Sequence, residues 1–192
     1  MKADACDAIK KNIFKEREEK ASFSELIASF DKDWAWLTGK NNLVDINDFF
    51  GRGIGTKGSY ELLKKQRGDL FRGATEDFKG IYVFFSTGKP FYAGISQNVI
   101  YRIHQHVKQK SHFSASMAFN IGKDLLQLQD INVGPAGDRK TLEKQVDWVI
   151  VQDFLMKQQI NFLPINSDDQ LALFEMYCTI EGGMAMNTFK TH

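Results

Sequence analysis

Apolar and polar residues follow one another most regularly in the stretch GIYVFFSTGKPFYAGISQNVIYRIHQH, residues 80–106. An apolar run leads to a turn at Thr87–Pro90 and a second run returns from it. Two short β-type runs around a Gly/Pro turn predict a β-hairpin. Apolar residues then recur every four positions, which predicts a helix packed on that hairpin, at Val99, Ile103 and Val107.

The N-terminal part of the chain is predicted to be helical. Residues 4–20 are rich in Lys, Glu and Ala and predict an exposed helix. Ser22 and Glu25 have the spacing of a capping box and predict a second helix through about Leu37. Residues 38–58 contain the glycine-rich run GRGIGTKG and predict a mobile connector, the alternative being a loop that touches a nucleic-acid backbone. The run lacks the GxxxxGK[ST] spacing of a phosphate-binding loop.

The remaining pattern predicts helices around one more strand. The expected elements are a short helix at 59–67, a helix over 115–128, a loop over 129–138, a helix over 139–158, a strand over 160–165 and a helix over 169–181 that begins at Asp168–Asp169. We therefore predict an α/β (α+β) protein with a small, mostly antiparallel three-stranded sheet flanked by helices. Residues 1–79 form an N-terminal helical extension and residues 80–192 the main domain.

Composition narrows the classes of protein that fit this pattern. A chain of 192 residues with 43% hydrophobic content can bury one core, with or without an appended element. No apolar run reaches the roughly 18 residues that span a bilayer, and the N-terminus lacks the apolar centre of a signal peptide. Cys6 and Cys178 stand apart from any Cys/His cluster, so we expect reduced thiols, a cytoplasmic protein and no zinc site.

Charge is balanced over the whole chain but not along it. With 25 basic and 24 acidic residues, a nucleic-acid surface has to be a local patch. Residues 80–112 contain no Asp or Glu, which suits a surface held against phosphates. A second basic stretch runs from Arg52 to Arg72 and fits either a DNA strand or a solvated face. The residues expected to contact nucleic acid are Lys89, Ser96, Arg102, Lys108, Lys110 and His112.

Polar groups suited to phosphate chemistry gather in the hairpin and its helix. Arg102 and His106 lie four residues apart, so they share one side of the predicted helix. Tyr82 and Tyr92 lie on the two runs of the hairpin. The pattern therefore predicts a site in one small supersecondary unit.

These residues resemble the signature of the GIY-YIG endonuclease family. The tripeptide Gly80-Ile81-Tyr82 is intact, Tyr92-Ala93-Gly94 stands for the second tripeptide, and Arg102 and His106 follow on a helix. Glu175 on a later helix and Asn187 after it fit the rest of the family's site. The resemblance covers about residues 80–192. Ala93 stands where the family has a larger aliphatic residue, and Met184–Met186 lacks the Pro expected before the Asn.

The resemblance implies a role for each of these side chains. Glu175 is the ligand of a divalent cation, Mg²⁺ (or Mn²⁺), and Arg102 binds the scissile phosphate. Tyr82 is the family's general base, although His106 titrates closer to neutral pH and is the alternative. Tyr92 orients the water or the phosphate, and Asn187 supports the site by a hydrogen bond to a tyrosine or a backbone group.

The function expected from the resemblance is metal-dependent hydrolysis of DNA phosphodiester bonds by an endonuclease with one active site. RNA is not excluded as a substrate, and a double-strand break needs a dimer or two successive cuts. Restriction, repair, mobile-element and toxin roles all remain open. The alternative is a catalytically inactive nucleic-acid-binding module with the same fold.

Overall fold

The computed structural model describes residues 21–111, 113–129, 139–184 and 186–187, and its centre is one antiparallel sheet. The strands β1 (Val44–Asp45), β2 (Gly80–Ser86), β3 (Lys89–Ser96) and β4 (Gln159–Pro164) are arranged in the order β1-β4-β2-β3. The mixed α+β class is confirmed, as is the hairpin β2–β3. The prediction of three strands was wrong by one, because β1 was hidden in the expected connector.

Strand β2 lies between β3 and β4 and is the most deeply placed element of the sheet. Tyr82 pairs with Gly94 on one side and with Phe162 on the other. Residues from Gly80 to Phe85 are all buried, as a strand covered on both faces requires. The first residue of β2 has to be a glycine, because a β-carbon at Gly80 would overlap the carbonyl oxygen of Leu163 and lie 3.1 Å from Pro164 Cα.

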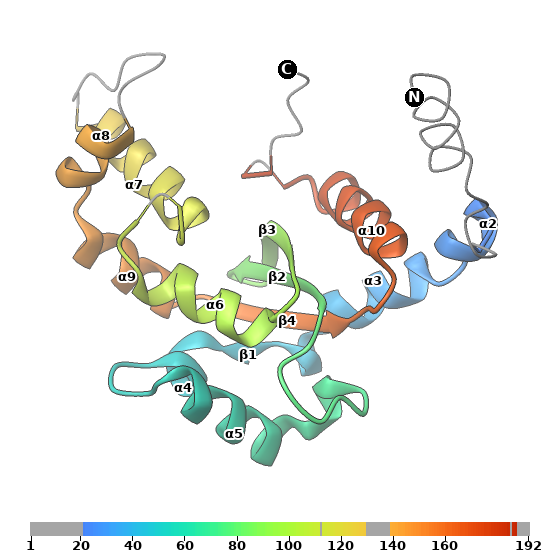
Figure 1. Ribbon diagram of the computed structural model, residues 1–192. Coiled ribbons are helices and arrows are strands. Elements are labelled where there is room, and N and C mark those ends of the chain that lie inside the picture. Colours follow the sequence, from blue (N-terminus) through green and yellow to red (C-terminus); the bar gives the residue numbers. More distant parts are fainter. Residues whose placement is uncertain (1–20, 112, 130–138, 185, 188–192) are drawn as a thin grey trace, which may run out of the picture.

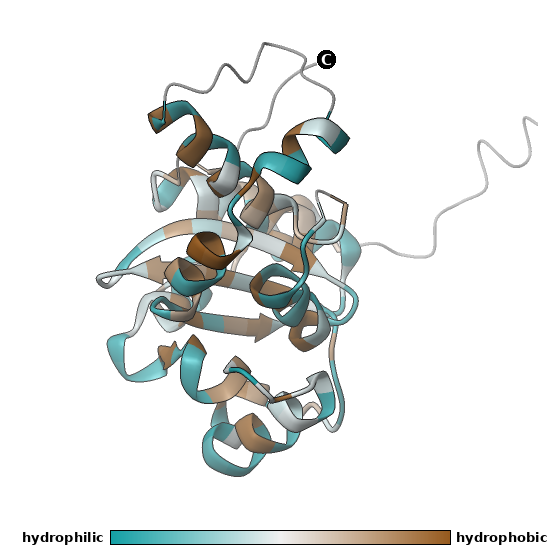
Figure 2. Cartoon of the chain, turned by 90° about the vertical axis from the view of Figure 1, so that its left-hand side faces the viewer, coloured by the Kyte–Doolittle hydropathy of each residue, from teal (hydrophilic) through white to brown (hydrophobic). Residues whose placement is uncertain are grey.

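Side chains of β2 alternate between two hydrophobic clusters, one on each face of the sheet. Tyr82 and Phe84 face the helices α4 (Ile46–Phe50), α5 (Thr56–Arg67), α6 (Val99–Lys108), α7 (Ser116–Leu128) and α9 (Trp148–Met156). Ile81, Val83 and Phe85 face α3 (Phe30–Thr38) and α10 (Asp168–Glu181). Brown, hydrophobic segments accordingly run along the central strands in Figure 2.

The helix predicted from Ser22 to Leu37 is divided in two. The capping box of Ser22 and Glu25 is present and begins α2 (Phe23–Ile27), which buries no residue. The chain then turns into α3, which buries Phe30 against the rings of Phe174 and Tyr177. The predicted helix over 4–20 lies outside the described residues.

The predicted connector over 38–58 contains regular structure. After α3 come the 3-10 helix η1 (Lys40–Asn42), β1 and α4, and α5 begins at Thr56, followed by η2 (Gly68–Phe71). The prediction failed because β1 is two residues long and α4 five, too short for a clear period. Burial of Ile46, Phe49 and Phe50 places this segment in the same core as the hairpin.

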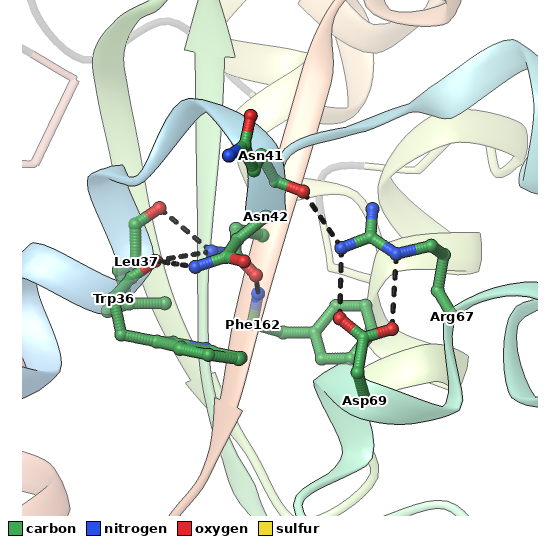
Figure 3. A network of polar contacts seen from close by, with 8 residues as sticks. Trp36, Leu37, Asn41, Asn42, Arg67, Asp69 and Phe162 are labelled. Carbon is green, nitrogen blue, oxygen red and sulfur yellow. Dashed lines mark hydrogen bonds and ion pairs between the residues drawn. The ribbon is translucent and has the colours of Figure 1, made fainter.

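Asparagine side chains join α3 to the rest of the fold, and Figure 3 shows Asn42 beside Trp36 and Leu37 at the end of this helix. Asn161 of β4 is fully buried and donates to the carbonyl oxygens of Trp36 and Leu37, at 3.1 and 2.9 Å. Asn42 donates to the Trp36 carbonyl as well, at 2.9 Å. Side chains of Asn42 and Asn161 thereby donate hydrogen bonds to carbonyl groups in the last turn of α3, where the helix itself supplies no i+4 donor.

The region expected as one helix over 139–158 is divided into α8 (Arg139–Gln145) and α9. The break falls at Asp147, whose carboxylate accepts the backbone N–H of Val149 and Ile150 and so begins a new helix. Helix α10 follows the prediction, but its N-cap is Ser167, with Asp168 and Asp169 in the first turn. No helix within the described ranges combines the length and the apolar character needed to cross a membrane.

Candidate active site

Tyr82 and His106 form a buried pair between the hairpin and α6. The Tyr82 hydroxyl lies 2.8 Å from His106 Nε2, and both side chains are closed to solvent. Burial, followed by the charge of Arg102, lowers the pKa of His106 to about 3. Burial, followed by Tyr92, raises the pKa of Tyr82 well above its ordinary value, although Arg102 opposes this shift. Both groups are therefore neutral at pH 7.

A glycine makes room for this pair. Gly94 lies opposite Tyr82 in the antiparallel register. A β-carbon at Gly94 would overlap the Tyr82 hydroxyl and lie 2.6 Å from Tyr82 Cζ. The glycine of the second tripeptide thus lets the phenol ring lie across β3 and reach His106.

Tyr92 borders the same pair and is partly exposed. Its ring centroid lies 6.2 Å from that of Tyr82 and 5.7 Å from that of His106. Burial raises the pKa of Tyr92; the Tyr82 hydroxyl and Arg102 lower it, and Glu175 raises it further. These influences show that groups from β2, β3, α6 and α10 act on one hydroxyl.

Arg102 is held beside the tyrosines by two hydrogen bonds. Its Nη1 donates to Gln105 Oε1 and to the carbonyl oxygen of Ser114, each at 3.0 Å. Its charge acts on Tyr82, Tyr92 and His106, as the pKa shifts of all three groups show. Within the described part of the chain no carboxylate forms an ion pair with Arg102, so its charge stays available to an anion.

Glu175 approaches the cluster from α10, which contacts β3 from the opposite face of the sheet. Its side chain is half-buried, and burial raises the pKa of the carboxyl group. No cation of the described residues forms an ion pair with it. The charge of Glu175 also contributes to raising the pKa values of Tyr92 and Cys178.

Asn187 binds the free edge of β3. Its Oδ1 accepts the backbone N–H of Ala93 at 2.9 Å, and its Nδ2 donates to the Ala93 carbonyl at 2.7 Å. The side chain thus continues the sheet beside Tyr92 and Gly94. Ala93 itself is fully buried in the cluster with Phe174 and Cys178, where a small side chain lets α10 come close to β3.

Of the six predicted catalytic residues, Tyr82, Tyr92 and His106 contact one another and Arg102 lies beside them, whereas Asn187 binds the strand that carries Tyr92 and Glu175 lies on α10, on the other face of the sheet. Spatial separation of Tyr82, Arg102 and Glu175 would have contradicted the predicted site. Arg102 acts on both tyrosines, and Glu175 acts on Tyr92. Contacts therefore connect α6 with the hairpin, and Glu175 of α10 acts on this group through its charge, which raises the pKa of Tyr92.

The predicted nucleic-acid contacts lie in different surroundings. Lys89 and Lys110 are exposed, whereas Ser96 forms hydrogen bonds with the backbone of Asn98. Lys108 donates to the carbonyls of Gly51, at 2.8 Å, and Ile54, so that it holds the glycine-rich loop. His112 lies outside the described residues.

The basic stretch from Arg52 to Arg72 is largely paired within the molecule. Arg52 pairs with Asp153 and Arg67 with Asp69, each at 3.1 Å. Arg72 pairs with Asp33 at 3.1 Å and covers the Trp36 ring at 4.6 Å. Figure 3 shows Arg67 between Asp69 and the Asn41 carbonyl. These pairs favour the interpretation of a solvated face for this stretch.

Asp77 contacts the active-site helix and was missed by the sequence analysis. Its carboxylate accepts the backbone N–H of Ile100 and of Tyr101, both at 2.9 Å, in the first turn of α6. Asn98, which occupies the N-cap position, makes no side-chain cap. Sequence spacing gives no signal for Asp77, because the cap comes from before β2 and the missing local cap is the only hint.

The described residues of the cluster offer few ligands for a divalent cation. The described residues include no group of three or more His, Cys, Asp or Glu side chains that could hold a metal ion. Glu175 offers one carboxylate without a cation partner. Mg²⁺ usually keeps several waters and binds through one or two carboxylates plus substrate phosphates, so a single ligand of this kind is sufficient only together with substrate.

Two cavities of the described surface lie outside the cluster. An apolar groove of about 400 Å³ lies between the hairpin, α7 and α9 and is lined by residues that include Phe91, Leu125, Ile150 and Phe154. A polar cavity of about 510 Å³ lies beside Asp45, Asp48 and Asp153.

Comparison with models of protein families, with curated proteins and with solved structures finds no match to this chain.

Proposed function

We propose that this protein is a metal-dependent endonuclease that hydrolyses DNA phosphodiester bonds at the cluster of Tyr82, Tyr92, Arg102, His106 and Glu175. The observation that carries the proposal is the hydrogen-bonded pair of Tyr82 and His106, which Tyr92 contacts between the hairpin and α6. Support also comes from two charged groups that form no ion pair within the described ranges, Arg102 beside the Tyr–His pair and Glu175 on α10. Cleavage of a phosphodiester needs a metal ligand, positive charge at the phosphate and a proton acceptor.

Arg102 supports the proposal through its charge and its planar donors. Hydrolysis of a phosphodiester is so slow without a catalyst that an enzyme has to lower the barrier by roughly 20 kcal/mol. A guanidinium group can form two parallel charge-assisted hydrogen bonds to phosphate oxygens. The Arg102 bond to the neutral acceptor Gln105 is one that a phosphate can replace.

Tyr82 is the better candidate for the group that takes the proton from water, which it can do only as the phenolate, after its own hydroxyl proton has been released to solvent. His106 lies behind it, fully buried, and a pKa of about 3 makes this ring a poor proton acceptor. In the tautomer with a proton on Nε2, His106 donates to the Tyr82 oxygen and stabilises its ionised form. We assign His106 as that donor. Its Nδ1 has no hydrogen-bond partner among the described residues and in this tautomer remains a bare acceptor.

Glu175 is the residue that would hold Mg²⁺ (or Mn²⁺). The cation, when bound, supplies a Lewis acid that polarises a phosphate oxygen. The part of Glu175 is to offer a carboxylate at the border of the cluster, close enough to Tyr92 to act on its hydroxyl. Tyr92, partly exposed, orients the water or the phosphate. DNA is the proposed partner, and the same chemistry would act on RNA.

Plasmid nicking tests this proposal. Supercoiled DNA is incubated with the protein over a series of Mg²⁺ and Mn²⁺ concentrations, beside Glu175→Gln and the control Glu181→Gln, an exposed residue of the same helix. We expect metal-dependent nicking by the wild type and by the control, and a loss of at least roughly 100-fold in Glu175→Gln, a typical effect of removing one charge-stabilising group. DNA binding measured by gel shift should change little.

Two outcomes of that experiment would contradict the proposal. Nicking that persists in Glu175→Gln would exclude Glu175 as the metal ligand. Gel-shift binding without any nicking at all metal concentrations would support the alternative of a nucleic-acid-binding module. RNA oligonucleotides run in parallel decide between the two substrate classes.

A further inference from the structure

The first turn of α6 is held from outside the helix. The backbone N–H of Phe78 and of Ile100 both donate to Asp77 Oδ1 at 2.9 Å, and that of Tyr101 donates to Asp77 Oδ2 at 2.9 Å. The carbonyl of Phe78 accepts the N–H of Val99 at 2.9 Å. Two consecutive residues upstream of the hairpin thereby bind the N–H groups that a helix leaves without partners at its start.

The other end of α6 is also held by the residues before the hairpin. Lys108 donates to the carbonyls of Gly51 and Ile54, and His104 Nε2 lies 3.1 Å from the Ile54 carbonyl. Helices α5 and α6 also contact each other. The segment from Gly51 to Phe78 therefore binds α6 at its beginning and at its end.

We propose that Asp77 is a positioning residue of the active site, and that residues 51–78 hold α6 in a fixed position relative to the hairpin. This inference rests on the proposed function. Arg102 and His106 both project from α6, whereas Tyr82 and Tyr92 project from the hairpin. A movement of the helix start thus separates the two halves of the cluster together.

The chemistry of the cap explains why a carboxylate is needed. The two oxygens accept from different N–H groups, so that the helix cannot rotate or slide without losing one of them. A negative charge at a helix N-terminus is also stabilised by the helix dipole. A displacement of about 1 Å at a reacting group can reduce a rate by 10²-fold, so small movements of α6 have large effects.

The test compares two helix caps of the same chemistry. Asp147 accepts two backbone N–H groups at the start of α9, as Asp77 does for α6, but α9 carries no residue of the cluster. Asp77→Ala, Asp77→Asn and the control Asp147→Ala are compared for plasmid nicking, DNA binding and thermal unfolding. We expect Asp77→Ala to lower kcat by roughly 10- to 100-fold with little change in KM. Asp147→Ala should lower the Tm and keep kcat within about twofold of wild type.

The conservative variant guards against loss of folding. Asp77→Asn keeps one acceptor oxygen and replaces the other by a donor, so its kcat should lie between those of wild type and Asp77→Ala. NMR of the unliganded protein adds a measurement that does not depend on nuclease activity. The ¹⁵N resonances of the His106 ring should shift in both Asp77 variants and stay unchanged in Asp147→Ala, because the Tyr82–His106 distance changes only in the former.

Retention of kcat in the Asp77 variants, with a Tm loss equal to that of Asp147→Ala, would overturn the inference. So would unchanged His106 resonances. If the wild type does not nick DNA, the proposed function fails, but the His106 resonances still decide whether Asp77 positions α6.

Discussion

At the scale of single residues, the neutral Tyr82–His106 pair makes the stability of the fold depend on pH. An imidazole without solvent has to lose its charge, and Arg102 nearby strengthens this requirement. The hydrogen bond to Tyr82 then satisfies one ring nitrogen. A buried histidine held neutral in this way links protonation to unfolding.

The first prediction concerns stability at acidic pH. The pKa of His106 is about 3 in the folded protein and 6.5 in the unfolded chain. Below pH 6.5 the unfolded state therefore binds a proton at His106 that the native state does not bind. Stability contributed by this residue is therefore present above pH 6.5 and is lost as the pH falls towards 3. We expect a loss of about 2 kcal/mol in the free energy of unfolding between pH 7 and pH 5.

Chemical denaturation of wild type and His106→Gln at the two pH values measures this loss. Glutamine can still donate to Tyr82 but does not titrate, so the variant should lack this part of the pH dependence. If the free energy of unfolding fell by the same amount between pH 7 and pH 5 in both proteins, His106 would have an ordinary pKa in the folded state.

At the scale of elements, α3 depends on one side chain of the sheet for its C-terminal end. Asn161 donates to two carbonyls of α3 and has no access to water. A hydrogen bond contributes about 1 kcal/mol net, and carbonyls left buried without a partner cost more. This contact is therefore a larger determinant of stability than the exposed α2, which buries nothing.

We expect Asn161→Ala to lower the free energy of unfolding by about 2–4 kcal/mol, since it removes the side-chain donor of the Leu37 carbonyl, takes one of several donors from the Trp36 carbonyl and opens a small cavity. Asn41→Ala is the matched control, because the side chain of Asn41 is exposed and only its backbone carbonyl is bonded. Urea unfolding of the three proteins measures the difference. A loss below about 0.5 kcal/mol, the range of ordinary surface substitutions, would contradict this account.

The hairpin, α6 and α10 could be predicted from sequence because each has a clear period or cap. Strand β1 and α4 could not, since they are too short to show a period and are held in place by partners such as Ile160 and Gln158. The break before α9 carried a local sign, an Asp two residues before Val149, but the apolar stripe through Val146 concealed it. Tertiary contacts decided each of these elements.

The candidate site divides in the same way. Tyr82, Tyr92, Arg102 and His106 lie within one hairpin and one helix, so local spacing was enough to bring them together. The place of Glu175 followed only from a resemblance, because α10 packs on the other face of the sheet. The contributions of Asp77 and of Lys108 depend on contacts across 23 and 57 positions, which no local pattern encodes.

At the scale of the whole molecule, the sheet is surrounded by helices on most sides, with the hairpin between α7–α9 and α10 in Figure 1. The cluster lies at this hairpin, and each chain contributes one such cluster. Under the proposed function, one site of this kind would cut one strand at a time, so the order in which DNA products appear would report how many chains act together.

We expect nicked circular DNA to accumulate before linear DNA when the protein is in large excess over plasmid as well as when it is dilute. The reason is that the second strand has to be cut in a separate event by the same or another chain. Gel electrophoresis over a time course measures the three DNA forms. Linear product that arises without a nicked intermediate would instead indicate a dimer with two coordinated sites.

The Asn187 amide has a consequence for assembly. A peptide unit and an asparagine amide offer the same N–H and C=O, and at Ala93 this amide takes the place that a foreign strand would need. The opposite border ends in the two residues of β1, too short a template for fibril growth. Truncation after Met186 would leave the strands intact while removing this blocking group, and the resulting polypeptide would be prone to stack with its own copies.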